Sequence, residues 1–105
     1  MTYTYNEAFE ASKKYFEGDE LAARVWATKY ALKDSQGNYF ELTPDDMHRR
    51  IAREIARIER KYKNPMDEQL LFDLMSHFRY LVPQGSPMAG IGNNLQVGSL
   101  SNCFV

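Results

Sequence analysis

The only cysteine of the chain, Cys103, stands in a segment whose pattern suits a reactive thiol. Residues 99–105 read as a β-strand, in which Ser99, Ser101 and Cys103 share one face. A strand face of small polar residues suits a ligand cavity. The same spacing also fits an inert cysteine buried on an internal strand, and the spacing alone favours that interpretation. Because the chain has no second cysteine, it can hold neither an internal disulfide nor a cysteine-based zinc site, and a redox role for Cys103 needs a thiol from outside these residues.

The segment 83–94 precedes this strand, carries no charge and is rich in small residues. Its three glycines let a ligand come close to the backbone. Ser86, Asn93 and Asn94 add neutral hydrogen-bonding groups that can hold an oxygen-rich ligand. We therefore expect a ligand-facing loop here, although many surface loops share this composition.

The histidines and the paired aspartates favour structural roles. His48 and His77 show no spacing to each other or to carboxylates that resembles a ligand set, so no metal site is predicted. Asp45 and Asp46 come directly after a Thr-Pro pair, where carboxylates stabilise the positive end of a helix. Metal binding or acid–base chemistry by this pair is the less favoured interpretation.

A group of arginines follows in the same expected helix. They alternate with glutamates and wrap several faces of the helix, which is typical of a solvated surface. A phosphate-binding stripe is the less favoured interpretation. The members of this group are Arg49, Arg50, Arg53, Arg57 and Arg60.

Composition narrows the class of protein. The chain of 105 residues has a net charge of -1 and a sequence pI of about 6.1, so neither nucleic acid nor a membrane is favoured as a partner. We see no leader-like segment and no apolar run near ~18 residues, and expect a soluble, cytoplasmic protein. Every charged residue lies between Glu7 and Arg79, which suggests a helical domain at 1–82 and a different part at 83–105.

Capping signals and apolar periodicity predict about four helices in the first part. The expected spans are 6–16, 19–32, 43–64 and 67–81. Asn6 and Thr43 are the expected caps of the first and third helices, and Gly18 is the expected stop of the first. Two surface ion pairs are expected on the third helix, Asp46–Arg50 and Glu59–Lys63. The residues expected to face the core are Phe9, Phe16, Leu21, Val25, Leu32, Met47, Ile51, Ile55, Ile58, Tyr62, Leu70, Leu71, Leu74, Met75, Phe78 and Leu81, with Trp26 and Tyr30 beside them.

Several stretches resemble the catalytic subunit of ribonucleotide reductases, most closely the adenosylcobalamin-dependent class. The first is Phe-Arg-Tyr-Leu-Val-Pro-Gln-Gly-Ser-Pro-Met-Ala-Gly-Ile-Gly-Asn at 78–93, which leads into Ser-Leu-Ser-Asn-Cys-Phe-Val at 99–105. Upstream lie Trp-Ala-Thr-Lys-Tyr-Ala-Leu at 26–32 and Thr-Pro-Asp-Asp-Met-His-Arg-Arg-Ile-Ala at 43–52. The resemblance covers nearly the whole chain.

This resemblance implies a mainly α chain, with a small N-terminal domain of about four helices followed by a glycine-rich loop and the first strand of a ten-stranded α/β barrel that is incomplete here. It implies that Cys103 is the first cysteine of a reducing pair in thiyl-radical chemistry, which converts ribonucleotides to deoxyribonucleotides. Ser86, Ser101 and Asn102 are expected at the substrate. The second reducing cysteine and the radical-bearing cysteine of the family would lie beyond Val105, so we expect this N-terminal piece to be inactive alone.

The resemblance also implies a cofactor and partners. Adenosylcobalamin is the expected cofactor, bound mainly by residues outside this chain. The expected partners are the remainder of the catalytic chain, a ribonucleotide substrate and a thioredoxin-like or other dithiol reductant. Two alternatives are open: a large subunit that uses a di-metal radical partner, and a helical interaction module whose C-terminal strand adds to the sheet of another protein.

Overall fold

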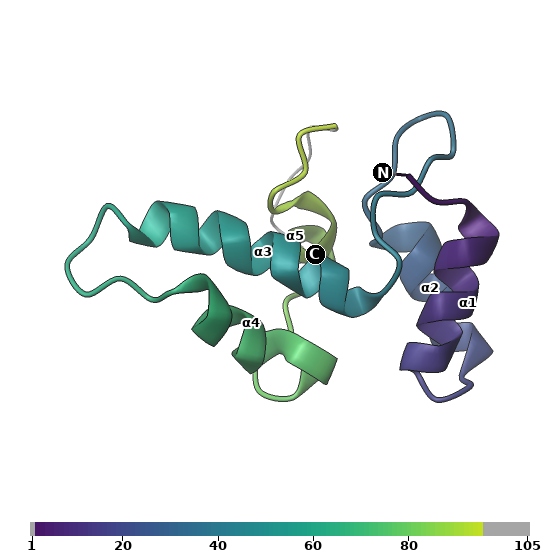
Figure 1. Cartoon of the computed structure of the whole chain (residues 1–105), viewed down its shortest axis with the longest axis horizontal. Helices are drawn as coiled ribbons and strands as arrows, with labels where there is room; N and C mark the ends of the chain where they lie inside the picture. Colours follow the sequence, from purple (N-terminus) through teal and green to yellow (C-terminus); the bar gives the residue numbers. More distant parts are fainter. Residues whose placement is uncertain (1, 96–105) are drawn as a thin grey trace, which may run out of the picture. The chain divides into compact units, whose positions relative to one another are not determined.

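The computed structural model describes residues 2–95, which form helices joined by turns and loops (Figure 1). The helices of this part are α1 (Tyr5–Tyr15), α2 (Glu20–Lys29), α3 (Pro44–Glu59), α4 (Glu68–Met75), the short 3-10 helix η1 (Ser76–Phe78) and α5 (Gly85–Gly90). β-Structure in the same range consists of isolated bridges, in which Tyr39 pairs with Tyr3 and with Lys33. The mainly helical fold class is confirmed. The barrel strand expected at 99–105 lies outside the described residues.

The chain forms two compact units, one up to Met47 and one from His48 onward, and the division falls within α3. Each unit has its own buried residues. Between residues 2 and 95, no helix has the length and apolarity needed to cross a membrane.

In the first unit, α1 and α2 lie side by side (Figure 1). They pack through small side chains. Ala8, Ala23 and Ala27 are fully buried, and such short side chains let two helix backbones approach closely. Trp26 fills the space beside them and donates its indole N–H to the sulfur of Met47, 3.4 Å away. The core of this unit is therefore a few large side chains surrounded by alanines.

Helix α1 begins earlier than predicted, because Thr4 and not Asn6 is its cap. The Thr4 hydroxyl accepts a hydrogen bond from the Glu7 N–H, 3.2 Å away, and the Glu7 carboxylate accepts one from the Thr4 N–H, 3.0 Å away. This reciprocal capping box satisfies two backbone donors at the start of the helix. The predicted stop is confirmed, since Gly18 adopts a φ of 94° just after the helix.

Helix α2 presents a different face to the core than predicted. The helix ends at Lys29 rather than Leu32, and its buried residues are the two alanines and Trp26. Leu21 is 66% exposed, so the predicted stripe through Leu21, Val25 and Leu32 is wrong. The face of α2 that is buried is therefore the one whose alanines let α1 pack closely, and not the face with the larger aliphatic side chains.

In the second unit, α3 and α4 bury a compact apolar set. Its members are Ile51, Ala52, Ala56, Leu71 and Met75. Helix α4 starts at a capping aspartate, Asp67, whose carboxylate accepts from the N–H of Leu70 at 2.7 Å. The predictions that Met47 and Ile51 of α3 and Leu71 and Met75 of α4 face inward are confirmed.

Helix α3 ends at Glu59, before the predicted end near 64. The N–H groups of Lys61 and Tyr62 bond three residues back instead of four, which tightens the chain after the helix. Asn64 then takes a left-handed φ of 58° directly before Pro65. Ile58 and Tyr62 are 41% and 65% exposed, so their predicted burial is wrong. Glu59 accepts from the backbone N–H of Met66 at 3.3 Å, which replaces the predicted pair with Lys63.

Helix α4 stops at Met75, although the apolar pattern continues to Leu81. His77 and Phe78 both have a φ of 55°, which turns the chain out of the helix. The carbonyl of Leu74 then accepts from the N–H groups of Tyr80 and Leu81, at 3.1 and 2.9 Å. Leu81 is consequently 49% exposed rather than buried, and Leu70 is likewise 47% exposed.

Candidate functional site

Part of the glycine-rich segment that was predicted as a loop is helical, since α5 spans Gly85–Gly90. The Met88 N–H donates to the Gln84 carbonyl and the Ile91 N–H donates to the Pro87 carbonyl, both at 3.0 Å. Proline is tolerated here because N–H groups in the first turn of a helix have no partner within the helix. Ser86, expected at the substrate, is the second residue of this helix.

Arg50 of α3 holds the C-terminal end of α5. Its Nη2 donates to the carbonyl of Met88 at 2.7 Å, and its Nη1 donates to the carbonyl of Ile91. The last carbonyls of a helix lack partners within the helix, and a cation at this end also complements the helix dipole. Arg50 is only 7% exposed, so the prediction of a solvated side chain is wrong at this position.

Gly92 follows α5 and packs against the stem of Arg50. It adopts a φ of 75°, which glycine takes readily. A β-carbon at this position would lie 2.9 Å from Cγ of Arg50 and 3.4 Å from its carbonyl oxygen. Both the backbone conformation and the available space therefore require glycine here.

The two asparagines after Gly92 differ in their surroundings. The Asn93 side chain donates to the carbonyl of Ala89 at 3.0 Å and accepts from the N–H of Leu95 at 2.8 Å. These two bonds give Asn93 a local role, because they fix the exit from α5. Its role as a ligand-binding group stays a prediction. Asn94 is exposed.

An apolar cleft of about 180 Å³ lies beside this segment. Ile51 and Ile55 of α3 line one part of it, and Ile91 lines another. The remaining lining comes from Met75 and from residues 81–83. The cleft carries few polar groups, so it offers little for recognition of an oxygen-rich ligand.

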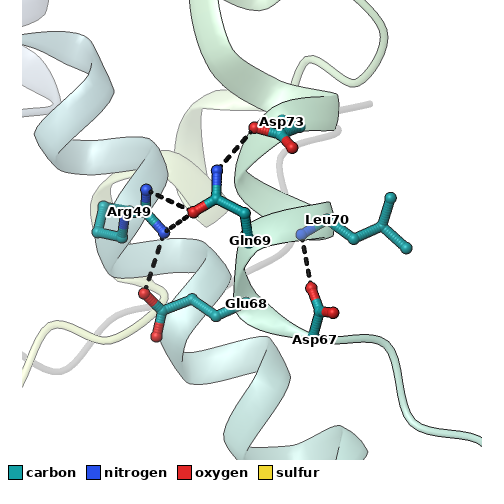
Figure 2. Close-up of polar contacts among 6 residues, drawn as sticks. All are labelled: Arg49, Asp67, Glu68, Gln69, Leu70 and Asp73. Carbon is teal, nitrogen blue, oxygen red and sulfur yellow. Dashed lines mark hydrogen bonds and ion pairs between the residues drawn. The ribbon is translucent and has the colours of Figure 1, made fainter.

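Arg49 also contacts side chains of α4 rather than lying on a solvated surface (Figure 2). Its guanidinium donates to Glu68 at 3.2 Å and to the side-chain oxygen of Gln69 at 3.3 Å, and Gln69 in turn donates to Asp73. The Arg49 Cζ lies 3.9 Å from the centre of the Phe72 ring. This cluster joins α3 to α4.

The other arginines of α3 agree with the predicted solvated surface, because Arg53, Arg57 and Arg60 are exposed. Arg57 pairs with Glu54 one turn earlier in the helix, and this contact lowers the pKa of the Glu54 carboxyl. The predicted surface pattern thus holds on one face of α3 and fails at Arg49 and Arg50.

Both aspartates lie in the first turn of α3, as predicted. The Asp46 carboxylate accepts from the N–H groups of Leu42 and Thr43, at 2.8 and 3.3 Å. Asp45 accepts from the hydroxyl of Tyr15 at 2.9 Å. Asp46 therefore acts as a capping group and not as the partner of Arg50 that was predicted.

The histidines are placed separately. His48 is fully buried, and its ring meets the edge of Phe78 with 4.7 Å between the ring centres. His77 is exposed and lies in the left-handed turn after α4. Within the described part of the chain, no group of three or more His, Cys, Asp or Glu side chains could hold a metal ion.

The remaining predicted site residues are not placed. Cys103, Ser101 and Asn102 lie outside the described residues, and their roles stay predictions. Of the predicted set, only the backbone of Ser86 is positioned, in α5.

Sequence reasoning missed the role of Arg50. A signal was present, because position 50 is three residues after the buried Met47 and therefore falls on the inward face of α3. An arginine on an apolar face needs buried acceptors, and the backbone carbonyls at the end of a short helix supply them.

Comparison with known proteins identifies the family. Residues 16–94, more than half of the chain, match the family described as "Ribonucleotide reductase, all-alpha domain". No curated protein and no solved structure matches the chain. The matched range includes α2, α3, α4, α5 and the segment held by Arg50. The chain therefore belongs to the ribonucleotide reductase all-alpha domain family, from the N-terminal portion of the large subunit.

Proposed function

We propose that the chain acts in a ribonucleotide reductase of the adenosylcobalamin-dependent class, which converts ribonucleotides to deoxyribonucleotides by thiyl-radical chemistry. The observation that carries this proposal is the family match over residues 16–94. The choice of class rests on the resemblance of Gly-Ser-Pro-Met-Ala-Gly at 85–90 and Ser-Asn-Cys-Phe-Val at 101–105. A large subunit with a di-metal radical partner resembles these two stretches less.

In this proposal Cys103 supplies one of the two thiols that reduce the substrate. The bond between the ribose 2′ carbon and its hydroxyl breaks, and the hydroxyl takes one thiol hydrogen and leaves as water. The hydrogen of the other thiol ends in a new C–H bond at the 2′ carbon. The two sulfurs supply the two electrons of this reduction and join in a disulfide. Two sulfurs that form such a bond must come within about 2.05 Å of each other, so the second thiol has to reach Cys103. A thioredoxin-like dithiol reductant then reopens the disulfide by exchange.

Ser86, Ser101 and Asn102 are proposed to bind the ribonucleotide. Hydroxyl and amide groups can donate to and accept from ribose hydroxyls without adding charge beside the reacting carbon. The position of Ser86 in a short helix whose far end is anchored by Arg50 supports a fixed contact with substrate. If α5 were held loosely, a smaller fraction of the enzyme–ribonucleotide complexes would have the geometry needed for reaction.

The proposed cofactor, adenosylcobalamin, would supply the radical. The described clefts, of about 210 and 180 Å³, are smaller than the ~300 Å³ at which pockets for drug-sized ligands begin. They do not fit a corrinoid, so we assign no described residue to this cofactor. We infer that the remainder of the catalytic chain binds it, and that the enzyme works in the cytoplasm, where thiols are kept reduced.

The test uses the reductase assembled from this chain and the remainder of its catalytic chain. We expect Cys103→Ser to abolish multiple turnover with a dithiol reductant while nucleotide binding is largely retained. The exposed Ser35, altered to Ala, is the matched control and should keep full turnover. Full multiple turnover by the Cys103→Ser enzyme would refute the assignment of this thiol.

A second measurement tests which class of ribonucleotide reductase contains this chain. Turnover that requires added adenosylcobalamin supports the proposal. Turnover that is independent of adenosylcobalamin and requires a separate di-metal protein would support the other class of large subunit. A chain that joins no reductase, but captures a partner through residues 96–105, would point to the interaction module instead.

A further inference from the structure

We propose that Arg50 is a positioning residue for the substrate segment: it fixes α5, and with it Ser86, by holding the carbonyls at the far end of this helix. The inference rests on the proposed function, because it assumes that Ser86 contacts the ribonucleotide. It is carried by two hydrogen bonds, from Arg50 to Met88 and from Arg50 to Ile91.

The first step concerns the stability of α5. A helix of six residues is far below the ~12–15 residues that give even marginal stability to an isolated helix. Its sequence, Gly-Ser-Pro-Met-Ala-Gly, also has two glycines, which have low helix propensity. The conformation of α5 must therefore depend on contacts with the rest of the second unit.

The second step concerns what Arg50 adds. The guanidinium is planar and carries several donors in a fixed arrangement, so it can hold two carbonyls at once. A charged donor forms a stronger hydrogen bond than a neutral one, and burial of Arg50 protects these bonds from water. Lysine keeps the charge but loses the planar arrangement.

The third step concerns the fit between Arg50 and Gly92. The stem of Arg50 passes so close to Gly92 that no β-carbon fits without displacement. The guanidinium thus holds the end of α5 while the stem contacts the backbone just beyond it. Contacts on both sides of Ile91 leave this end of α5 little freedom to shift.

The consequence for the reaction is pre-organisation. Ser86 is separated from Met88 by one residue, so movement of the α5 end changes the position of Ser86. A substrate that must first order this helix binds more weakly by the free energy of ordering. Arg50 therefore acts through α5 and touches no reacting atom.

The first experiment measures amide hydrogen exchange in the 105-residue chain. We expect Arg50→Gln to speed exchange at Met88 and Ile91 by roughly ten-fold or more, because hydrogen bonds to charged groups contribute ~1.5–3 kcal/mol. Tyr30 and Tyr39, whose N–H groups are bonded within the first unit, should exchange as in the unaltered chain. The matched control is Arg53→Gln, which alters an exposed arginine of the same helix. It should leave the exchange rates of all four amides unchanged.

Two results would overturn the role of Arg50 in fixing α5. One is unchanged exchange at Met88 and Ile91 in the Arg50→Gln chain. The other is equal acceleration at all four amides, which indicates general loss of stability. Should Arg50→Gln fail to fold, Arg50→Lys provides the same comparison, with a smaller expected acceleration at Met88 and Ile91.

The second experiment measures KM and kcat for the ribonucleotide in the assembled reductase. We expect Ser86→Ala and Arg50→Lys each to raise KM several-fold with a smaller change in kcat, while Arg53→Lys leaves both constants unchanged. If Ser86→Ala leaves KM unchanged, the proposed substrate role of Ser86 fails, and the exchange result alone decides whether Arg50 fixes α5. If Ser86→Ala raises KM and Arg50→Lys does not, the positioning role is overturned while the substrate role stands.

Discussion

Arg49 and Phe72 join α3 to α4 through a direct contact of cation and ring: Cζ of Arg49 lies 3.9 Å from the centre of the Phe72 ring. The same guanidinium meets Glu68 at 3.2 Å, and both of these charged side chains are about one-third exposed. Water weakens the ion pair at such a site, so it contributes only ~0.2–1 kcal/mol. The ring contact adds an attraction that solvent screens less well.

We therefore predict measurable coupling between Arg49 and Phe72. A double-mutant cycle with Arg49→Lys and Phe72→Leu should give a coupling of about 0.5–1 kcal/mol in the free energy of unfolding, measured with urea. The cycle of Arg53→Lys with Phe72→Leu is the control and should be additive. Additivity in both cycles would show that the ring contact contributes nothing measurable.

A second prediction separates backbone strain from steric contact at Gly92. Alanine at a left-handed position costs about 1–2 kcal/mol, and this cost applies to Gly92→Ala and to Gly37→Ala alike. Only at Gly92 would the new β-carbon also meet Arg50, since Gly37 has no neighbouring atom within 4 Å. Urea unfolding should therefore show a larger loss of stability for Gly92→Ala. An equal or larger loss for Gly37→Ala would contradict the close contact with Arg50.

The parts of the fold that sequence predicts well are those set by neighbouring residues. The start of α3 was predicted because Thr43, Pro44 and Asp46 act within a single turn of the chain. The stop at Gly18 was predicted for the same reason. Such local signals need no knowledge of the rest of the fold.

The errors arose where distant residues decide the structure. The spacing of α3 places Arg50 on the inward face, but the carbonyls that hold it come from residues 38 and 41 positions later in the chain, so its partners cannot be identified from α3 alone. The end of α4 was missed because Phe78 and Leu81 continue the helical spacing after the backbone has turned. For the candidate site, sequence suggested the segment and Ser86, whereas the structure added Arg50 and Gly92.

A third prediction concerns pH. The Asp34 carboxylate accepts from the N–H groups of Gln36 and Asn38 and from the Asn38 side chain, each at 2.9 Å. These bonds, above all the one from the Asn38 side chain, hold the pKa of Asp34 below its usual value of 3.8. Since the folded-state pKa is the lower one, the stabilisation is complete well above pH 3.8 and is lost as the pH falls through the folded-state pKa. The Tm of Asp34→Ala should lie below that of the unaltered chain at pH 6, and the gap should narrow in strong acid.

Asn38→Ala provides the matched test of this cause. Removal of the Asn38 side chain should raise the pKa of Asp34 toward 3.8, as followed by NMR titration of the carboxyl carbon. The Asn38 backbone N–H is retained, so the pKa should stay partly lowered. An unchanged pKa would assign the shift to the backbone donors instead.

The start of α1 supplies a last prediction, which distinguishes the cap seen in the structure from the cap expected from sequence. Thr4→Ala removes the hydroxyl that accepts from Glu7 and should lower the free energy of unfolding by about 1 kcal/mol. Asn6 lies inside α1 and is exposed, so Asn6→Ala should leave stability unchanged or raise it by a few tenths of a kcal/mol, because alanine is the better helix former. Urea unfolding of the two variants shows which of the two residues caps the helix. A greater loss for Asn6→Ala than for Thr4→Ala would move the start of the helix back to Asn6, and the bond from the Thr4 N–H to Glu7 would then have no stabilising role at this end of α1.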